Sequence, residues 1–503
     1  MSDRDDDTYG DDLYDERDAR DDMPEEERPL GVGDLSPFST PDTDEDDDLE
    51  YAFDDSEWGS QAEEVYESLL GRIGEAAPQP RLEATRRVVE LLGDPHRAYP
   101  VIHVTGTNGK TSTSRIIESI LRAYGLRTGL MTSPHLERVN ERIVIDGSPV
   151  SNRDLVANWG DVEPFIHLVD GELEAAGDEP LTYFEALTVL AFATFAEAPV
   201  DVAVIEVGMG GEWDSTNVAD GQVAVFSPIA LDHTQRLGST IEEIARTKSG
   251  IIKPVASVVS AAQTPAALAE LRRAAELTES TLTLEDEGFA LESTTIAVGG
   301  QLVSVRGRAG IYEGLFLPLF GEYQAHNAAL AIAAVESFLG DGTQPLVGDV
   351  LAEGLGAVTS PGRLQPIGTE PTVLVDAAHN PHGAAALATA IGQYFDFDEV
   401  AIVLGVLQDK DARGIVAALA PIAARIHVTQ SSSDRAVPYE ELVDLALELS
   451  HEDATYQFEE PLDAIEAARA WAAEGEKRGV VVTGSITLVG EAIRLGREEG
   501  WLK

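Results

Sequence analysis

A run of apolar residues leads directly into a glycine-rich loop and then into a helical pattern near residue 100. The three parts read YPVIHVT, GTNGKT and TSRIIESILRAYG. In a strand–loop–helix unit of this kind, backbone N–H groups and the helix N-terminus face phosphate groups, and the lysine reaches the terminal phosphates. The loop departs from the full GxxxxGK(S/T) pattern, since Val104 occupies the first glycine position, and an ordinary tight turn is the alternative. The residues that we expect to bind a nucleoside triphosphate are Gly106, Thr107, Asn108, Gly109, Lys110, Thr111 and Ser112.

The pattern around this loop is that of a parallel sheet with helices on both faces. Apolar strands such as VDVAVIEVG and QVAVFSPIA alternate with apolar helices such as LTYFEALTVLAFATFAEA, and this alternation predicts parallel strands that are covered on both sides. A second series of strands follows PGRLQP, namely TVLVDAAHNP, EVAIVLGVLQ, ARIHVTQSS and GVVVTGS. We therefore expect an α/β fold with a nucleotide-binding central domain in residues 58–359 and a Rossmann-like α/β domain in residues 360–503.

Acidic residues dominate the chain, with 90 Asp and Glu against 35 Lys and Arg and a net charge of −55. Residues 1–57 contain 25 of the acidic residues and few apolar ones, so we expect a disordered acidic tail there. The remainder is acidic too, which predicts a solvated surface whose self-repulsion is screened by salt, as in the cytoplasm of a halophile. Because the chain shows no basic stripe, long apolar span or secretion signal, we expect neither a nucleic-acid nor a membrane partner.

Two further residues stand where strands end. Glu206 ends VDVAVIEVG, and a carboxylate at the end of a parallel strand beside a phosphate loop can hold Mg²⁺, which prefers oxygen ligands. The glycines that follow it at positions 208, 210 and 211 allow close backbone approach, and a capping or salt-bridged glutamate is the alternative. His233 follows QVAVFSPIA in the segment LDHT. From its position alone, a metal ligand and a structural histidine are equally good interpretations.

The glycine-rich loop and its surroundings resemble the Mur ligase superfamily, and within it the branch of folylpolyglutamate synthase and dihydrofolate synthase. The segment LEATRRVVELLGDPHRAYPVIHVTGTNGKTSTS is similar to that branch, in which a helix ending in LG(N/D)P precedes the loop. The similarity extends over about residues 60–503 through TSPHLERVNERI, TYFEALT, EVGMGGEWDSTN, LDHT, ARTKSGIIKP, GEYQAHNAA, PGRLQP, DAAHNP, GVLQDKD, DRA and GSITLVGE.

This resemblance implies a fold and an activity. The fold is a P-loop-type Mur ligase central domain followed by a C-terminal ligase domain. The activity is an ATP- and Mg²⁺-dependent ligation in which the γ-phosphoryl group moves to a substrate carboxylate and L-glutamate attacks the resulting acyl phosphate. The acceptor is a folate or a pteroate, and the enzyme is a cytoplasmic monomer.

The resemblance also implies ligands for two Mg²⁺ ions. Glu206 matches the carboxylate that the two metals share, Ser133 matches a serine on the first ion, and His233 matches a ligand of the second. Lys248, in ARTKSGIIKP, matches a lysine that carries a carbamate (N6-carboxylysine). An ammonium would repel Mg²⁺, whereas a carbamate is an anionic oxygen donor, and its formation requires a pocket that lowers the pKa of the amine. A surface lysine is the alternative.

Four residues in the second half of the chain match nucleotide contacts of the family. Arg363 matches an arginine on the phosphates, Asp376 an aspartate on the ribose, and Asn327 a residue that contacts adenine. His379 matches a histidine beside them. Turn and capping chemistry is the alternative for each, and for Asn380 it is an equally good interpretation. The residues that we expect to be catalytic are Lys110, Lys248 and His379.

One departure from the family and three other functions complete the expectations. Glu212 stands where the family usually has Arg in GGRxD, which changes the charge beside anionic substrates.

Another Mur-type amide ligase acting on a non-folate acid is the nearest alternative, although TYFEALT and the LGDP lead-in argue against it. A nucleotide-dependent switch would need the loop but not Lys248, His233 and a second Rossmann unit. A dinucleotide oxidoreductase is disfavoured because neither sheet opens with GxGxxG.

Overall fold

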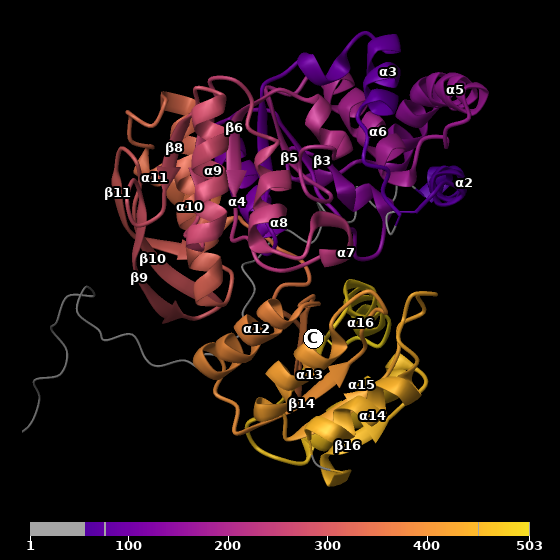
Figure 1. Ribbon diagram of the computed structural model, residues 1–503. Helices are drawn as coiled ribbons and strands as arrows, with labels where there is room; N and C mark the ends of the chain where they lie inside the picture. Colours follow the sequence, from indigo (N-terminus) through magenta and orange to yellow (C-terminus); the bar gives the residue numbers. More distant parts are fainter. Residues whose placement is uncertain (1–55, 75–76, 451, 502–503) are drawn as a thin grey trace, which may run out of the picture. The chain divides into compact units, whose positions relative to one another are not determined.

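The computed structural model describes residues 56–74, 77–450 and 452–501, whose strands form three sheets (Figure 1). The predicted acidic tail falls in residues 1–55, outside the described residues, except for its last two positions, which begin the 3-10 helix η1 (Ser56–Trp58). Within the described ranges, no helix has both the length and the apolar character that are needed to cross a bilayer.

The largest sheet has eight strands in the order β4-β3-β2-β5-β1-β6-β7-β8. The six strands from β2 to β8 in this order run parallel, whereas β3 and β4 join antiparallel at one edge. The predicted α/β fold with a mostly parallel sheet is confirmed. The strands are β1 (Val101–Thr105), β2 (Thr128–Met131), β3 (Ile143–Ile145), β4 (Ser148–Pro149), β5 (Val202–Glu206), β6 (Gly221–Phe226), β7 (Ser257–Ser260) and β8 (Thr281–Leu284).

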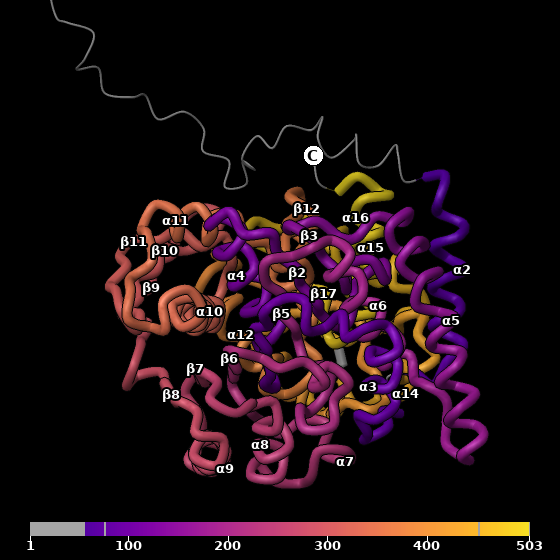
Figure 2. The backbone as a smooth tube through the Cα atoms, turned by 90° about the horizontal axis from the view of Figure 1, so that it is seen from above, coloured from indigo at the N-terminus to yellow at the C-terminus, as the bar shows by residue number. Residues whose placement is uncertain are grey.

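Helices cover both faces of this sheet, because residues that alternate along each strand point to opposite sides and are apolar on both. On one face α4, α10 and α11 enclose a core that includes Ile116, Val204 and Leu330. On the other face α2, α3, α5 and α6 enclose a core around Phe192 and Ile205. Figure 2 shows α2 and α5 side by side. The helices are α2 (Gly59–Leu70), α3 (Glu83–Leu91), α4 (Lys110–Ala123), α5 (Asn152–Ala176), α6 (Tyr183–Glu197), α7 (Thr234–Leu237), α8 (Ile241–Ser249), α9 (Pro265–Leu277), α10 (Glu322–Gly340) and α11 (Gly348–Gly356).

The long helix α5 begins at a capping serine. Ser151 is the N-cap, and its side chain accepts a hydrogen bond from the backbone N–H of Asp154 over 3.0 Å. A capping serine satisfies one of the free N–H groups of the first turn. Helix α6 starts with a capping box in which Thr182 and Glu185 exchange hydrogen bonds. Both helix starts are therefore set by local side-chain chemistry.

A second, antiparallel sheet of three strands has the order β11-β10-β9 and precedes α10. On β10, Val303 and Val305 are buried in the core while Leu302 is 40% exposed. The sequence pattern does not predict this sheet, because its outer face carries apolar as well as polar residues and the alternation is weak. Its strands are β9 (Ala290–Ala297), β10 (Gly300–Arg306) and β11 (Ile311–Leu317).

The third sheet has six strands in the order β12-β13-β17-β14-β15-β16, all parallel except the edge strand β12. Four of them were predicted, and the structure adds β12 and β16 at the two edges. The predicted domain boundary after residue 359 falls between α11 and β12 and stays a prediction. The strands are β12 (Gln365–Thr369), β13 (Thr372–Asp376), β14 (Glu399–Leu404), β15 (Arg425–Val428), β16 (Thr455–Gln457) and β17 (Arg478–Thr483).

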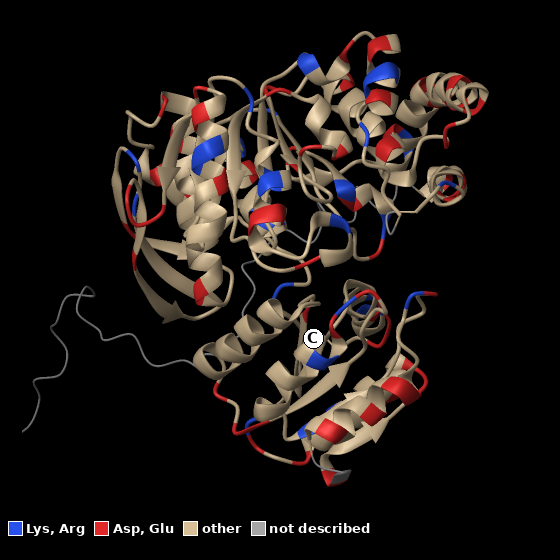
Figure 3. Ribbon diagram, viewed as in Figure 1, with Lys and Arg blue, Asp and Glu red and all other residues tan. Residues whose placement is uncertain are grey.

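Helices flank this third sheet as well, with Leu387 and Ile415 in the core on one side and Ile465 and Trp471 in the core on the other. In the part of the chain that the structure describes, acidic residues are spread over helices and loops (Figure 3). The helices are α12 (Pro381–Tyr394), α13 (Ala412–Leu419), α14 (Tyr439–Leu449), α15 (Pro461–Ala473) and α16 (Ile486–Glu498).

Candidate active site

The phosphate loop follows β1 and is packed tightly on both sides. Gly106 and Gly109 have φ angles of 147° and 90°, which favour glycine. A Cβ on Gly106 would lie 1.9 Å from Ser227 Oγ, and a Cβ on Gly109 would lie 2.6 Å from Asn327 Oδ1. Both glycines are therefore required by the space around them as well as by their backbone conformation. The loop leads directly into α4, whose free N–H groups give it the character of an anion site.

Glu206 ends β5 beside the loop and is almost fully buried, at 1% exposure. Both of its carboxylate oxygens accept hydrogen bonds from Thr111 Oγ1 over 3.0 Å, and Oε2 accepts a further one from the N–H of Ser133 over 3.3 Å. Burial raises the pKa of Glu206, whereas the charge of Lys110 and the hydrogen bond from Thr111 lower it. Parallel pairing of β5 with β1 and β2 brings these residues to one edge of the sheet. Their carboxylate and hydroxyl oxygens are suitable ligands for a hard cation such as Mg²⁺.

Lys248 lies in the last turn of α8 and is buried, at 4% exposure. Its amine donates a hydrogen bond to the carbonyl oxygen of Gly106 over 2.6 Å. Lys110 approaches the same oxygen with its own amine at 3.4 Å. Burial and the charge of Lys110, opposed by Asp232 and Asp214, together lower the pKa of Lys248 to about 7. Near neutral pH a substantial fraction of Lys248 is therefore the uncharged amine, the form that acts as a nucleophile.

His233 follows β6 and is the N-cap of the short helix α7, with a φ angle of 49°. Its Nε2 lies 3.8 Å from Asp232 Oδ2, and Lys410 Nζ lies 3.4 Å from Asp232 Oδ1. Burial lowers the pKa of His233 to about 4, while Asp232 works against this shift and Lys410 adds to it. The imidazole is therefore neutral at physiological pH, which is the form that ligates metals.

The expected metal ligands come together only in part. Within the described ranges, no three His, Asp or Glu side chains form a cluster that could hold a metal ion by themselves. Glu206 and Ser133 are in hydrogen-bond contact. Lys248 contacts the loop at Gly106, and His233 has Asp232 as its nearest acidic neighbour. The expected ligands of a first ion, Glu206 and Ser133, are therefore in contact. Lys248 and His233, the expected ligands of a second ion, form no hydrogen bond or ion pair with each other in the described structure.

Residues after β13 contact the phosphate loop directly. The side-chain amides of Asn108 and Asn380 exchange hydrogen bonds over 3.0 and 3.4 Å, and Asn108 Nδ2 lies 2.9 Å from His382 Nδ1. Asn380 also caps α12, with its Oδ1 accepting from the N–H of Gly383 over 2.8 Å. The capping interpretation of Asn380 is therefore confirmed, and the same side chain also contacts the phosphate loop.

Of the three expected residues around β13, Asp376 and His379 are held in place by hydrogen bonds, whereas Arg363 bonds only to the neighbouring Gly362. Asp376 accepts hydrogen bonds from the N–H groups of Leu364 and Ala378, each over 2.9 Å. Burial raises its pKa, and the charge of Arg363 opposes that shift. His379 Nδ1 lies 2.9 Å from the carbonyl oxygen of Ala377, and burial lowers the pKa of His379 to about 4. The Nδ1–H therefore donates to this carbonyl, and Nε2 is left as an acceptor.

Asn327 on α10 belongs to a buried hydrogen-bonded chain. Its Nδ2 donates to Gln324 Oε1 over 3.0 Å, and Gln324 Nε2 donates to Ser112 Oγ over 3.2 Å. Ser112 Oγ lies 3.0 Å from Ser360 Oγ. All four side chains are at most 6% exposed. The chain connects α10, the first turn of α4 and the segment that leads to Arg363.

The site contains residues that the sequence analysis did not select. They are Asp232, Gln324, Ser360, His382 and Lys410. Lys410 is one of only six lysines and stands in the motif GVLQDKD, and Asp232 precedes His233 in LDHT. These two could have been found from the scarcity of lysine and from adjacency. Gln324, Ser360 and His382 have no such signal, because only the fold places them beside the loop.

The unusual Glu212 lies in the glycine-rich turn after β5. Its N–H donates to the carbonyl oxygen of Thr247 over 2.8 Å, and its own carbonyl oxygen accepts from Asn217 Nδ2 over 3.0 Å. A Cβ on Gly250 would lie 2.5 Å from Glu212. The backbone of Glu212 is therefore held close to the end of α8, next to Lys248, while its side chain is exposed.

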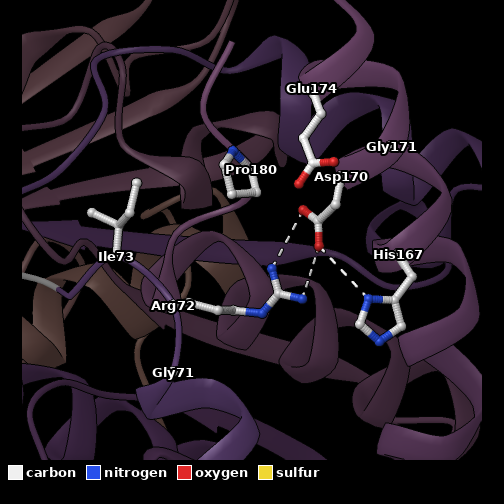
Figure 4. A pocket seen from close by; sticks show the side chains of 8 residues that line it. All are labelled: Gly71, Arg72, Ile73, His167, Asp170, Gly171, Glu174 and Pro180. Carbon is white, nitrogen blue, oxygen red and sulfur yellow. Dashed lines mark hydrogen bonds and ion pairs between the residues drawn. The ribbon is translucent and has the colours of Figure 1, made fainter. Parts of the chain in front are cut away.

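A cavity of about 430 Å³ lies between the end of α2, the second half of α5 and the segment before α6. Figure 4 shows Arg72 directed toward Asp170, with His167 and Glu174 on the same wall. Arg72 Nη2 lies 3.0 Å from Asp170 Oδ2, and Arg72 Nη1 also donates to the carbonyl oxygen of Leu181 over 3.0 Å. None of the residues expected at the active site lines this cavity. Its ion pair connects α2 and α5 to the start of α6.

Comparisons with known proteins agree with this geometry. Residues 104–335 match the family model of the Mur ligase middle domain, and residues 362–486 match that of the Mur ligase glutamate ligase domain. The chain is 43% identical over 449 residues to the dihydrofolate synthase/folylpolyglutamate synthase of Mycobacterium tuberculosis, covering 85% of this chain and 92% of that protein. It is 35% identical over 421 residues to a probable bifunctional folylpolyglutamate synthase/dihydropteroate synthase of Haloferax volcanii, covering 82% of this chain and 48% of that protein.

A solved structure extends the comparison to three dimensions. Folylpolyglutamate synthase of Mycobacterium tuberculosis complexed with ADP superposes with a TM-score of 0.84 at 42% identity. The superposition covers 87% of this chain and 99% of that one. The likeness therefore includes both of the larger sheets and the loops between them.

Proposed function

The chain belongs to the Mur ligase family, in its folylpolyglutamate synthase/dihydrofolate synthase branch, and from this premise we propose that it joins L-glutamate to the carboxylate of a folate or a pteroate at the expense of ATP. The observation that carries the proposal is the contact of the buried Glu206 with Thr111 and Ser133 beneath the phosphate loop. It brings three strand ends together at the place where a nucleotide and a cation would bind.

We assign nucleotide binding to the loop and to residues that contact it. The backbone amides of residues 106–112 and the N-terminus of α4 would hold the phosphates, with Lys110 at the terminal ones. Asn327 lies against Gly109, which supports its assignment to the base. Arg363 and Asp376 are assigned to the phosphates and the ribose.

Glu206, Ser133 and Thr111 are the residues that would hold Mg²⁺, since they supply buried oxygen donors beside the loop. An ion there would neutralise negative charge on the phosphoryl group as it is transferred. Lys110 adds a positive charge on the same side, and the burial of the site strengthens both interactions.

We assign a second cation to His233 and to a carbamate on Lys248. The neutral state of His233 and the lowered pKa of Lys248 support this assignment. A neutral amine can attack CO₂ and release a proton to form a carbamate. The carbamate is an anion with two oxygen donors, whereas the protonated lysine would be a cation. The second ion and the carbamate are proposals that rest on this chemistry and on the resemblance.

The reaction proceeds in two transfers. A carboxylate oxygen of the acceptor attacks the γ-phosphorus, and the bond from phosphorus to the ADP oxygen breaks, which leaves an acyl phosphate. The amine of L-glutamate then attacks the acyl carbon, and phosphate departs with the oxygen that came from the acceptor. His379 can accept a hydrogen bond at Nε2, and we assign it to orient the attacking amine. Closure around the site excludes water, which would hydrolyse the acyl phosphate.

The working conditions follow from the charge of the chain. A net charge of −55 produces self-repulsion that high salt screens, and one relative comes from Haloferax volcanii. We therefore propose that the enzyme works best at molar salt. The monomeric state stays a prediction.

The test is a substrate panel in molar salt. ADP release is measured with L-glutamate and either dihydropteroate or a reduced folate, and the products are identified by mass spectrometry. We expect amide product in step with ADP for at least one acceptor. Turnover only with a non-folate acid would favour another Mur-type ligase, and nucleotide binding without amide formation would favour a switch.

A further inference from the structure

Arg115 lies one turn after Thr111 on α4 and makes no direct contact with a group of opposite charge among the described residues. Within the described part of the chain, its guanidinium makes no hydrogen bond and no close ion pair. This is unexpected in a protein with 90 acidic and 35 basic residues. Residues four apart on a helix share a face, so Arg115 is directed to the same side as Thr111. It lines a small cavity between α4, the segment before β12 and the start of α16.

A second guanidinium lines the same cavity. Arg363 also makes no ion pair among the described residues, and its only hydrogen bond there is from Nη1 to the carbonyl oxygen of Gly362 over 3.1 Å. Burial lowers the pKa of Arg115, the charges of Glu206, Glu141 and Glu118 oppose that shift, and the charge of Arg363 adds to it. Two partly buried like charges that line one cavity repel each other, and an anion between them would relieve that repulsion.

The nearest carboxylates are already engaged by other groups. Glu141 lines the cavity, but its two oxygens accept hydrogen bonds from the N–H groups of residues 136, 137 and 138 over 2.7 to 2.8 Å. Glu206 is bonded to Thr111 and to Ser133. Both carboxylates attract Arg115 through their charge, but neither is in hydrogen-bond or ion-pair contact with it.

The cavity has a volume of about 20 Å³, which holds roughly one water-sized group. It has room for one oxygen of an anion between the two arginines and not for a whole substrate. Because the protein carries a net charge of −55, anionic substrates need local cationic contacts to bind at all.

We propose that Arg115 and Arg363 together bind an oxyanion of a substrate, and that Arg115 is a substrate-binding residue of this enzyme. The inference rests on the proposed ligase function for the source of the anion, which is either a phosphoryl group of the nucleotide or a carboxylate of the incoming amino acid. Guanidinium groups suit both, since their planar donors match carboxylate and phosphate oxygens.

The test uses the full-length protein in molar salt and three variants. Arg115→Gln removes the charge, Arg115→Lys keeps it, and Arg122→Gln is the control. Arg122 lies two turns further along α4 and is ion-paired with Glu118 over 3.0 Å, outside the cavity. Titration calorimetry measures ADP with Mg²⁺, and then inorganic phosphate and L-glutamate added to the ADP-loaded protein. Thermal unfolding is followed for each variant.

We expect Arg115→Gln to weaken phosphate or glutamate binding at least tenfold, Arg115→Lys to recover part of the loss, and Arg122→Gln to stay within twofold of wild type. A loss confined to glutamate assigns the site to the amino-acid carboxylate, and a loss confined to ADP or phosphate assigns it to the phosphoryl group. The unfolding midpoint of Arg115→Gln should stay close to that of wild type, since the substitution breaks no hydrogen bond or ion pair of the described structure. Binding of all three probes within twofold of wild type in Arg115→Gln would overturn the proposal.

If the wild type shows no ligation but the binding loss is seen, the anion site stands and only the proposed function fails.

Discussion

The amine of Lys248 donates a hydrogen bond to the carbonyl oxygen of Gly106 over 2.6 Å, so the last turn of α8 is joined to the first residue of the phosphate loop. The two residues are 142 positions apart in the sequence. This contact places a buried amine with a pKa of about 7 directly beside the place where phosphates and cations would bind. Protonation or modification of Lys248 would therefore change the charge beside the phosphate loop.

We predict that Lys248 carries a carbamate in the active enzyme. Protein equilibrated with ¹³C-bicarbonate should give one carbamate resonance by NMR that is absent from Lys248→Ala. Because the reactive form is the neutral amine and the pKa is about 7, the signal should grow as the pH rises from 6 to 8. Lys253→Ala is the matched control, since Lys253 lies nearby but donates to the carbonyl oxygen of Asn217 over 2.8 Å. A signal that persists in Lys248→Ala would rule the assignment out.

Glu206→Gln should abolish ligation and leave the fold intact. The amide keeps the size and part of the hydrogen bonding to Thr111 but loses the charge that holds a cation, so we expect kcat to fall by about two to four orders of magnitude. Glu118→Gln is the control, because Glu118 is also buried but pairs with Arg122 and Thr128. That variant should lose about 1 to 3 kcal/mol of stability and retain kcat. A Glu206→Gln enzyme with near-normal kcat would remove this carboxylate from the site.

The hydroxyl pair of Ser112 and Ser360 should act as one unit. If their contact over 3.0 Å fixes the segment that carries Arg363, then Ser112→Ala, Ser360→Ala and the double variant should lose similar amounts of kcat/KM for ATP. A double-mutant cycle measures this coupling. Losses that add up in the double variant would show that the two hydroxyls act independently.

Histidine 427 should make the fold less stable as the pH falls below neutrality. Its ring lies between those of Tyr456 and Phe458, with centroids 5.1 and 5.4 Å away, and neither ring nitrogen has a hydrogen-bond partner in the described structure. Burial lowers the pKa of His427 from 6.5 to about 4. Between these values the unfolded chain binds the proton and the folded chain does not, so stability is lost as the pH falls.

The measurement is denaturant unfolding of wild type and His427→Phe at pH 7 and pH 5, at fixed high salt. The wild type should lose about 2 kcal/mol more than the variant over this interval. The phenyl ring fills the same space between the two aromatic rings, so the variant should be at least as stable as wild type at pH 7. Equal losses in the two proteins would mean that His427 does not titrate as its burial implies.

Sequence patterns predicted those parts of the structure that are encoded locally. The strand before Gly106, the glycine-rich turn at 106 and 109 and the helix that follows it each depend on neighbouring residues, and all are present. The contact between Asn108 and Asn380 spans 272 positions, and no local period encodes it. The pairing of Asp232 with Lys410 is equally remote. Such contacts depend on how the parallel strands are ordered, which periodicity does not specify.

The most direct test of the account follows the acceptor oxygen. A pteroate or folate acceptor labelled with ¹⁸O in its reacting carboxylate is incubated with ATP, Mg²⁺ and L-glutamate in molar salt, and the released phosphate is analysed by mass spectrometry. Transfer through an acyl phosphate predicts one ¹⁸O in each phosphate, with ADP and amide product formed in equal amounts. Phosphate without label, or ADP formed at the same rate when glutamate is omitted, would contradict the proposed ligase mechanism.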